Sequence, residues 1–487
     1  MNEIYDVIII GGGVVGCGTA RELMRRKAKV LLLEKTNDIC NGQSKANTAI
    51  IHGGYDAKPG TLKAKFNVLG NAMFDQLHEE LDVPVQWNTS LVVSFSEEGH
   101  ASLEKLLDQG RQNGVRGELR IIDEKELRER EPNVGSEAKE ALLVGAGGIV
   151  CPYELTVAFA ENAAKNGAEF LRNAGVTEVR KLDTGLWQVV SAAGTFETRA
   201  VVNAAGTYAD VINNMVSERK VHIHPRRGEY YILDKKYKDV FHAAMFQLPT
   251  KMGKGILVAP TVDGTVLVGP TAEDIDDKED KRTTAEGLEK ALKQAGRTWE
   301  HIPTRGFITT FAGLRATGDT GDFILGEPED APLFFNCCAI ESPGLSSAPA
   351  IAQWTAEQIA EKLGLEPNPA FDPIRKAIPK FRDMSDEERA AAIAENADFG
   401  KIVCRCETVT EAEIRESIRR PVGARDVDGV KRRTRAGMGR CQAGFCTPRT
   451  VEILAEELGV SPLEVTKFGG DSKLLQGYLF EEGKNNA

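Results

Sequence analysis

A short apolar run that ends in three glycines is the feature that most constrains the fold of this chain. Residues 5–10 read YDVIII, and the glycines at 11–13 follow directly. A helical pattern over 14–26 and a second apolar run over 29–33, closed by Glu34, come next. A strand, a glycine turn, a helix and a second strand in this order form a parallel βαβ unit. The N-terminal part is therefore predicted to be an α/β domain.

The glycines also match the GxGxxG pattern of a dinucleotide-binding turn. Gly11 permits the tight turn, Gly13 lets the backbone approach a pyrophosphate, and Gly16 lets the helix pack closely on the strand. Backbone amides at the N-terminus of the following helix would face the negative charge of this pyrophosphate. Glu34, 18 residues after Gly16, can accept hydrogen bonds from an adenosine ribose and would repel a 2′-phosphate. A turn that served only chain reversal would leave Glu34 unexplained.

A second run, VVNAAG at 201–206, ends a strand in small residues. Ala205 and Gly206 would allow a second backbone approach to a bound dinucleotide, which favours FAD over NAD. The same residues also suit a plain tight turn, so this observation does not decide the cofactor alone.

Composition bounds the class of protein. With 487 residues, 41% hydrophobic and 27% charged, the chain fits two to three globular domains rather than a disordered protein. No window approaches the ~18 consecutive apolar residues of a membrane helix. The net charge of −11 argues against nucleic acid as a partner. Glu3 and Asp6 stand where a secretory signal would carry Lys or Arg, so we expect a cytoplasmic protein, with any attachment to the inner membrane made through a partner.

The rest of the sequence predicts a second lobe and a separate C-terminal module. Periodicity between about 60 and 135 is mostly helical, whereas 218–330 carries short alternating strands typical of an antiparallel substrate lobe. A proline-rich stretch follows residue 365. The predicted divisions are a first domain at 1–365, a linker at 366–398, a module at 399–455 and a tail at 456–487.

Four of the nine cysteines are packed into one segment, and their spacing indicates a metal centre. The pattern is C-x-C at Cys404 and Cys406, then C-x4-C at Cys441 and Cys446. In a chain without an export signal thiols stay reduced, which favours metal ligation over disulfides. Zinc accepts four thiolates, but usually through C-x2–4-C pairs on both sides. The observed spacing fits a [2Fe–2S] cluster better, with zinc as the alternative.

Positive charge gathers around the last two cysteines. Residues 425–449 carry seven basic residues against two acids, a net charge of +5. This charge is either solvated surface, or a basic patch that raises the potential of the cluster and docks an acidic electron acceptor. RNA binding is a weaker interpretation, because the arginines lack the regular aromatic interleaving of a nucleic-acid surface.

Five segments, in order along the chain, resemble one family of flavoenzymes. They are DVIIIGGGVVGCGTARELMRR, SKANTAIIHGGYDAKPGTLKAK, NAAGTYAD, FAGLRATGDTGDFILG and ESPGLSSAPAIA. Together they resemble the FAD-dependent D-amino-acid-oxidase-like superfamily, and more closely its glycerol-3-phosphate dehydrogenases and oxidases and their 2-hydroxyglutarate-oxidising relatives. The module at 399–455 resembles the bacterioferritin-associated-ferredoxin-like [2Fe–2S] domain. The resemblance implies an α/β fold, with a Rossmann-type FAD-binding domain, an antiparallel-sheet substrate lobe and a small C-terminal [2Fe–2S]-binding module.

The resemblance also implies a set of cofactor-binding residues. The adenosine and pyrophosphate positions of the family fall on the glycine turn and Glu34, and Val176 falls where a backbone contact to adenine is expected. A late glycine turn at 344–346 meets the flavin ring, where a helix N-terminus can stabilise negative charge. The residues expected to bind FAD are Gly11, Gly13, Val14, Val15, Gly16, Glu34, Lys35, Ser44, Asn47, Val176, Ala205, Gly206, Gly344, Leu345 and Ser346.

His52, in the segment IIHGGY, is the expected catalytic base. Hydride leaves a C–OH carbon only if a base takes the hydroxyl proton, and histidine titrates near neutrality without a large perturbation. The neighbouring glycines permit close approach to a ring, and the position matches the HxG segment of the family. His222 and His224, which alternate on a strand, are the competing candidates.

Arg315, in AGLRAT, coincides with the substrate-binding arginine of the family. Its guanidinium suits phosphate and carboxylate alike. Lys254, in MGKGILVAP, either adds a second charge that favours a phosphate dianion or is a solvated hairpin lysine. Ser342 is expected to contact a substrate hydroxyl. Ala316 stands where the family often has proline, a departure that affects loop rigidity more than charge.

We therefore expect FAD-dependent oxidation of sn-glycerol 3-phosphate to dihydroxyacetone phosphate. Hydride would pass to flavin N5, and electrons would pass on to the [2Fe–2S] cluster and then to an acceptor protein subunit or a quinone. The nearest alternative is a dehydrogenase of a 2-hydroxy acid such as 2-hydroxyglutarate. A second alternative is an electron-transfer subunit without its own substrate.

Overall fold

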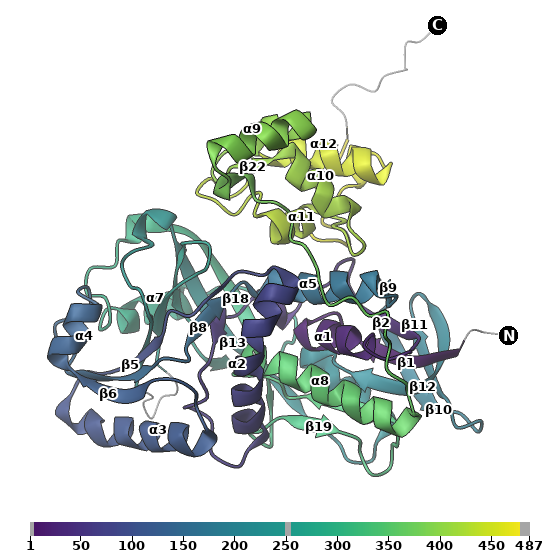
Figure 1. The fold of residues 1–487 in the computed structure, drawn as a ribbon, viewed down its shortest axis with the longest axis horizontal. Helices are drawn as coiled ribbons and strands as arrows, with labels where there is room; N and C mark the ends of the chain where they lie inside the picture. The colour runs from purple at the N-terminus through teal and green to yellow at the C-terminus, as the bar shows by residue number, and fades with distance from the viewer. Residues whose placement is uncertain (1–3, 249–254, 478–487) are drawn as a thin grey trace, which may run out of the picture. The chain divides into compact units, whose positions relative to one another are not determined.

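The structure is a computed structural model that describes residues 4–248 and 255–477. The chain divides into two compact units (Figure 1). Unit 1 comprises Met1–Lys35 and Ile39–Ala377, and unit 2 comprises Thr36–Asp38 and Ile378–Ala487. The segment 366–398, expected from its prolines to be a linker, is thus divided between the two units.

Unit 1 contains a mostly parallel sheet with the strand order β10-β11-β12-β1-β2-β9, in which β20 also pairs with β12 and β19 pairs with β20. Strands β20, β12, β1, β2 and β9 run parallel. Helix α1 packs on α5 and α8, and α8 packs on α2. The strands are β1 Ile4–Ile10, β2 Val30–Leu33, β9 Glu169–Leu171, β10 Val176–Lys181, β11 Trp187–Ser191, β12 Gly194–Asn203, β19 Ile324–Gly326 and β20 Phe334–Cys338. The helices are α1 Val14–Leu23, α2 Leu62–Leu81, α5 Pro152–Lys165, α6 Ala209–Val216 and α8 Gly344–Leu363.

The central strands of this sheet are apolar on both faces. All four residues of β2 and all five of β20 are buried, as are the last four of β1. Parallel strands covered on both faces read as continuous apolar runs, because neither face meets water. The carboxyl ends of β1, β2 and β12 lie at the same edge of this buried sheet.

A second sheet forms the other lobe of unit 1. Its order is β17-β13-β16-β15-β14-β5-β7-β6, with β18 also paired to β13. All pairs are antiparallel except β14 with β5. The strands are β5 Ser90–Ser94, β6 Leu119–Asp123, β7 Glu140–Val144, β13 Ile223–Leu233, β14 Ala244–Gln247, β15 Leu257–Pro260, β16 Val266–Gly269, β17 Glu273–Asp274 and β18 Phe307–Gly318. Helices α3 His100–Asn113, α4 Glu124–Arg130 and α7 Ala285–Ala295 belong to this lobe, and a small third sheet joins β3 Ile50–Ile51, β8 Gly148–Val150 and β4 Val85–Gln86.

The second lobe reaches beyond the residues 218–330 expected from the sequence. The segment from about 60 to 135 is helical in α2, α3 and α4, yet it also supplies β5 and β6 to the second sheet. Strand β5 pairs with β14, more than 150 positions further along the chain. Local periodicity therefore says little about where β5 lies in the sheet. None of the helices in the described ranges combines the length and apolarity needed to span a bilayer.

Unit 2 is a set of short elements around its own core. Its elements are α9 Asp386–Glu395, β21 Ile402–Cys404, β22 Val409–Thr410, α10 Glu411–Arg419, α11 Val427–Thr434 and α12 Thr447–Leu458. None of these helices exceeds 12 residues, and helices of that length are marginal alone, so tertiary contacts must hold them. Ile414, Val430 and Leu454 are fully buried at its centre, and Val465 from the expected tail joins the same core.

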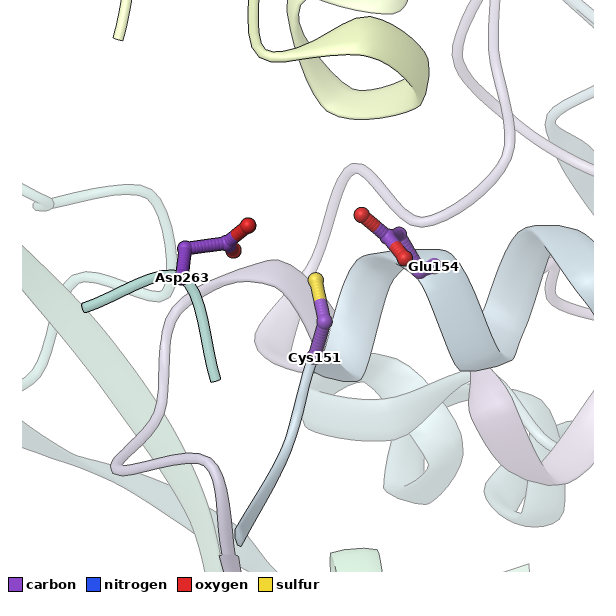
Figure 2. Close-up of side chains that lie close together, drawn as sticks. All are labelled: Cys151, Glu154 and Asp263. Carbon is purple, nitrogen blue, oxygen red and sulfur yellow. The ribbon is translucent and has the colours of Figure 1, made fainter. Parts of the chain in front are cut away.

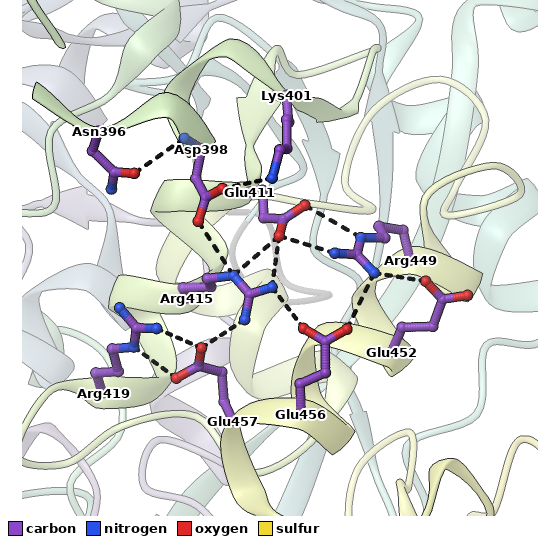
Figure 3. Close-up of polar contacts among 10 residues, drawn as sticks. All are labelled: Asn396, Asp398, Lys401, Glu411, Arg415, Arg419, Arg449, Glu452, Glu456 and Glu457. Carbon is purple, nitrogen blue, oxygen red and sulfur yellow. Dashed lines mark hydrogen bonds and ion pairs between the residues drawn. The ribbon is translucent and has the colours of Figure 1, made fainter. Parts of the chain in front are cut away.

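Ion pairs connect α10 with α12 (Figure 3). Arg415 of α10 lies 2.6 Å from Glu456 and 2.7 Å from Glu457, both on α12, and 2.6 Å from Glu411 on its own helix. Arg449 of α12 reaches back to Glu411 at 2.9 Å. Because several charges share partners, this network stabilises the helix pair more than isolated surface pairs would.

The segment Thr36–Asp38 belongs to the core of unit 2 although it lies near the start of the chain. The Asp38 carboxylate is fully buried and accepts hydrogen bonds from Arg432 at 2.7 Å and from Arg433 at 2.7 and 2.8 Å. Burial alone would raise the pKa of Asp38, but the guanidinium groups of Arg433 and Arg432 lower it to about 2. A buried carboxylate held by two arginines is costly to disrupt, because either partner left alone is an uncompensated charge.

Candidate functional site

The glycine turn after β1 has room for no side chain at two positions. Gly11 has φ +112°, and a Cβ there would lie 2.4 Å from the carbonyl oxygen of Ala204. A Cβ at Gly16 would lie 2.0 Å from the carbonyl oxygen of Gly11. The turn therefore brings the end of β1 against the end of β12 and packs α1 directly on the strand, as a dinucleotide-binding turn requires.

Two predicted side chains contact the amides of this turn. Glu34, at the end of β2, accepts the Gly12 N–H at 2.8 Å, and the Ser44 hydroxyl accepts the Val14 N–H at 2.9 Å. Both side chains are buried. Asn47 follows on the same segment and donates to the Ser44 carbonyl at 3.0 Å. The turn, the acid and the flavin-side segment thus meet at the carboxyl edge of the parallel sheet, where nucleotides bind in such folds.

The remaining adenosine-side candidates lie around the same edge. Gly206 follows β12 with φ +60°, and a Cβ there would lie 2.9 Å from the Gln43 side chain. Val176 begins β10, close in sequence to Ala174, whose N–H donates to the Glu34 carbonyl at 2.8 Å. The Lys35 side chain is engaged elsewhere, since it pairs with Glu279 at 2.7 Å.

The N-terminal turn of α8 holds the backbone of His52. Ser346, fully buried, accepts the His52 N–H at 2.7 Å through its hydroxyl. Asn67 and Asn71 of α2 donate to the His52 carbonyl at 2.6 and 3.1 Å. The imidazole ring lies 5.6 Å from the ring of Phe246, measured between centroids. The expected base and the expected flavin-facing turn, which includes Gly344 and Leu345, are therefore neighbours.

The candidate substrate-binding arginine lies on β18. Arg315 stands opposite Arg226 of β13 in the strand register, and its guanidinium donates to the Thr271 carbonyl at 3.4 Å. A Cβ at Gly228 would lie 3.1 Å from both terminal nitrogens of Arg315, so this glycine leaves space for the guanidinium. Lys254, the second expected cation, lies outside the described residues.

Glu341 is a site residue that sequence reasoning missed. It pairs with Lys63 of α2 at 2.8 Å and accepts the Thr317 hydroxyl at 3.0 Å. Burial would raise the pKa of Glu341, but Lys63, Thr317 and the nearby charge of Arg315 lower it. Glu341 directly precedes Ser342, which is half-buried, so the turn 341–346 contacts the surroundings of Arg315 on one side and His52 on the other. The position inside the ESPG motif was the available signal, whereas its partner Lys63 is 278 residues away.

The competing histidines lie at one end of β13. The rings of His222 and His224 are 6.1 Å apart, and His224 lies 3.9 Å from Asp319. His224 stands opposite Thr317 in the strand register, whereas the backbone of His52 is bonded directly to Ser346 at the start of α8. We keep His52 as the candidate base.

A group of potential metal ligands also lies in unit 1. The sulfur of Cys151 and carboxylate oxygens of Glu154 and Asp263 lie within 4.8 Å of one another (Figure 2). Sulfur and carboxylate oxygen together suit zinc. No second observation among the described residues indicates a cation, so we assign no metal to this group.

The four clustered cysteines of unit 2 meet as two pairs. Cys404 contacts Cys446, and Cys406 contacts Cys441. Within the described ranges, the Cys151 group is the only set of three or more such ligand atoms within 4.8 Å, so no three of these four sulfurs are that close. A single zinc would draw all four sulfurs to about 3.8 Å of one another. The choice between zinc and a [2Fe–2S] cluster therefore rests on the spacing of the cysteines along the chain.

Hydrogen bonds prepare one of these sulfurs for metal binding. The Cys446 thiol, together with backbone amides of Gly437 and Glu407, lowers the pKa of Cys404 to about 6. Metals bind the thiolate, so a thiol that ionises readily is a better ligand. Amide donors to cluster sulfurs also raise the reduction potential of an iron–sulfur centre.

Comparisons with known proteins agree with this geometry. Residues 6–358 match the family described as FAD dependent oxidoreductase, and residues 402–456 match the BFD-like [2Fe-2S] binding domain. A glycerol 3-phosphate dehydrogenase of Caloramator mitchellensis is 50% identical over 477 residues, which cover 97% of this chain and 98% of that protein. The solved structure of the dithionite-reduced L-alpha-glycerophosphate oxidase of Mycoplasma pneumoniae, with FAD bound, is 30% identical with a TM-score of 0.73 and covers 77% of this chain and 98% of that one. An L-2-hydroxyglutarate dehydrogenase of Escherichia coli (strain K12) is 29% identical over 274 residues, 55% of this chain and 64% of that protein.

Proposed function

The chain belongs to the FAD-dependent oxidoreductase family and carries a BFD-like [2Fe-2S] binding domain, and from this premise we propose that it oxidises sn-glycerol 3-phosphate to dihydroxyacetone phosphate. The cofactors are FAD and a [2Fe–2S] cluster. The observation that carries the substrate is the 50% identity, over nearly the full length of both chains, to a glycerol 3-phosphate dehydrogenase.

FAD, when bound, supplies the acceptor for the substrate hydride at flavin N5. The residues proposed to hold it are those of the glycine turn and the carboxyl edge of the parallel sheet, namely Gly11 to Gly16, Glu34, Ser44, Asn47, Val176, Ala205 and Gly206. Gly344, Leu345 and Ser346 begin α8, a helix of 20 residues whose positive N-terminal end stabilises negative charge on the ring.

His52 takes the hydroxyl proton of the substrate at an imidazole nitrogen. The backbone of His52 makes three hydrogen bonds, with Ser346, Asn67 and Asn71. These bonds fix the position of the backbone that carries the imidazole ring. Arg315 holds the phosphate, and Ser342, on the same turn as Glu341, contacts a hydroxyl. Lys254 is proposed as the second phosphate-binding cation.

Cys404, Cys406, Cys441 and Cys446 would hold the [2Fe–2S] cluster, which would pass electrons from the flavin to an acceptor one at a time. The acceptor beyond the cluster is either a protein subunit or a quinone. The match of residues 402–456 to the BFD-like [2Fe-2S] binding domain supports iron–sulfur rather than zinc.

An anaerobic visible spectrum before and after addition of glycerol 3-phosphate tests this proposal. We expect the flavin bands to bleach promptly and a brown absorbance to remain from the cluster. The same titration with 2-hydroxyglutarate tests the rival dehydrogenase, which the lower and partial identity to the Escherichia coli protein supports less well. Bleaching by 2-hydroxyglutarate alone would overturn the assignment of glycerol 3-phosphate as the substrate. Bleaching by neither compound would favour an electron-transfer subunit without its own substrate.

Substitution of His52 tests the base. His52→Ala should slow flavin bleaching by roughly 10²–10⁴-fold, the usual contribution of a general base. His222→Ala is the matched control and should bleach at the rate of the unaltered chain. A full rate in His52→Ala would remove His52 from this role.

A further inference from the structure

The loops that carry the four cysteines of unit 2 present an exposed surface, which we call the cluster face. It consists of Ile402, Arg405, Cys406, Gly444 and Phe445. Phe445 precedes the cluster ligand Cys446 and is 84% exposed, the most exposed large hydrophobic side chain in the described ranges. Ile402 is 47% exposed, and the ligand Cys406 is itself exposed. Exposed apolar side chains gathered beside a functional centre often mark an interaction site.

The charge on the cluster face comes from Arg405, not from the basic stretch 425–449 as a whole. Most arginines of that stretch are occupied inside unit 2: Arg432 and Arg433 are buried on Asp38, and Arg435 is buried on Glu407. Arg449 pairs with Glu411 and Glu452 at 2.9 and 2.8 Å, as Figure 3 shows. These pairs offset part of the net positive charge of the stretch.

Arg405 differs from these arginines. It lies between Cys404 and Cys406, is exposed, and makes no ion pair or hydrogen bond with any residue that the structure describes. Arg440, directly before Cys441, is exposed as well. The cluster face therefore combines an exposed aromatic side chain with positive charge around the cluster ligands.

We propose that the cluster face is the docking site for a small acidic protein that carries one electron at a time. This proposal rests on the proposed function and specifies its acceptor. An aromatic side chain and an arginine are the residue types that most often dominate binding energy at protein interfaces. Positive charge steers an acidic partner and sets its orientation, and a small contact area suits transient electron transfer.

The electron balance of the proposed exchange is complete. Oxidation of one secondary alcohol to a ketone breaks its C–H and O–H bonds and releases two electrons and two protons. The electrons leave through the cluster singly, so two carrier molecules are reduced for each molecule of substrate, and the protons pass to water. The co-reactant is the oxidised one-electron carrier.

Two haem proteins of opposite charge serve as probes for the full-length holoprotein. Cytochrome b5 is acidic and cytochrome c is basic, and each accepts one electron. With glycerol 3-phosphate as the reductant under anaerobic conditions, we expect cytochrome b5 to be reduced at a rate that falls as ionic strength rises, because salt screens the attraction. Binding of oxidised cytochrome b5, measured by titration calorimetry, should weaken with salt in parallel.

Substitutions on the cluster face should weaken this exchange. Phe445→Ala should lower kcat/KM for cytochrome b5 and raise the dissociation constant by about 10- to 30-fold, the size of an interface hot spot. Phe445→Leu, which keeps an apolar side chain beside Cys446, should recover part of the loss. Arg405→Glu should slow reduction of cytochrome b5 and accelerate that of cytochrome c, because reversed charge changes the two encounters in opposite directions.

Matched controls lie elsewhere on unit 2. Phe468→Ala removes another exposed aromatic side chain, 55% exposed, and Lys473→Ala removes an exposed cation, and neither should change the rates. Iron content and the visible spectrum confirm that each variant retains its cluster. Substrate-driven bleaching of flavin and cluster, recorded without any carrier, reports the proposed function separately from docking.

Three results would overturn the proposal. The first is an unchanged rate and affinity for cytochrome b5 in Phe445→Ala with its cluster intact. The second is slower reduction of the cluster by substrate in that variant, which would mean that the face receives electrons rather than delivers them. The third is reduction of a water-soluble ubiquinone analogue but of neither cytochrome, which would assign the face to a quinone.

Discussion

The two redox sites of this chain are built from different materials. The FAD site is shaped by backbone: at Gly11 and Gly16 a single added carbon would lie 2.4 and 2.0 Å from a carbonyl oxygen. The proposed cluster site is defined by side chains, four sulfurs carried by strand β21 and by the segments beside short helices. A site made by close backbone approach is destroyed by one methyl group, whereas a site made by ligands is destroyed by a change of ligand or of the charges that hold its loops. The two sites should therefore fail independently and for different reasons.

The largest effect should come from a methyl group in the glycine turn. Gly16→Ala places a Cβ 2.0 Å from the Gly11 carbonyl oxygen, so α1 must shift away from β1, and we expect loss of bound FAD. Flavin absorbance of the purified protein measures it, and iron content should be unchanged. Gly175→Ala is the matched control, because its Cβ would meet Lys35 at an ordinary 3.5 Å. Retention of FAD in Gly16→Ala would contradict the close-approach argument.

The reciprocal change removes the cluster and leaves the flavin. Cys406→Ser replaces one ligand of an exposed position, and we expect the iron content of the chain to fall to a small fraction while glycerol 3-phosphate still bleaches the flavin. Cys151→Ser, which alters a cysteine of unit 1, should keep its iron. If the unaltered chain contains one zinc and no iron, the iron–sulfur interpretation fails.

Substitution of Asp38 should destabilise unit 2 alone. Asp38→Asn leaves Arg432 and Arg433 buried without their counter-charge, which should lower the free energy of unfolding of unit 2 by about 3–5 kcal/mol. Urea unfolding followed by the cluster absorbance measures the change. Asp428→Asn, which breaks a half-exposed pair with Lys467, is the control and should cost less than about 1 kcal/mol.

The same residue gives unit 2 a dependence on pH with a defined sign. The folded-state pKa of Asp38 is about 2, below its ordinary value of 3.8, so its stabilisation is present above about pH 4 and is lost as pH falls toward 2. The loss amounts to about 2 kcal/mol. The difference in unfolding free energy between the unaltered chain and Asp38→Asn should narrow over this range, as urea titrations followed by far-ultraviolet circular dichroism would show. A constant difference down to pH 2 would contradict the assignment.

The smallest effect should come from the ion-pair network between α10 and α12. Arg415→Ala removes contacts with Glu411, Glu456 and Glu457 and should cost about 1–2 kcal/mol, because several pairs are lost together. Arg419→Ala removes one pair from a side chain that is 60% exposed and should cost less than about 0.5 kcal/mol. High salt should reduce the difference between the two variants. Equal costs would mean that sharing of partners adds nothing.

The sequence could predict those parts of the site whose residues lie close together along the chain. Strand, glycine turn, helix and Glu34 lie within 34 residues, and the spacing of the cysteines already indicates their chemistry. Glu341 was missed because its role depends on Lys63, 278 positions away. The segment LVVSFSEE from Leu91 interrupts the helical pattern, but its place in the second sheet was missed because its partner β14 comes from the far half of the chain. The net charge of the stretch 425–449 could not show which arginines are paired, since the acids that pair with Arg432, Arg433 and Arg435 lie outside it.

The membership of Thr36–Asp38 in unit 2 has a consequence for how the protein is made. During synthesis Asp38 leaves the ribosome 394 residues ahead of Arg432. At the usual rates of translation this interval is roughly 20–80 s. Throughout it Asp38, five residues beyond the end of β2, lacks the two arginines that hold its carboxylate in the folded chain. The segment Thr36–Asp38 can therefore join its unit only when the final tenth or so of the polypeptide is being made.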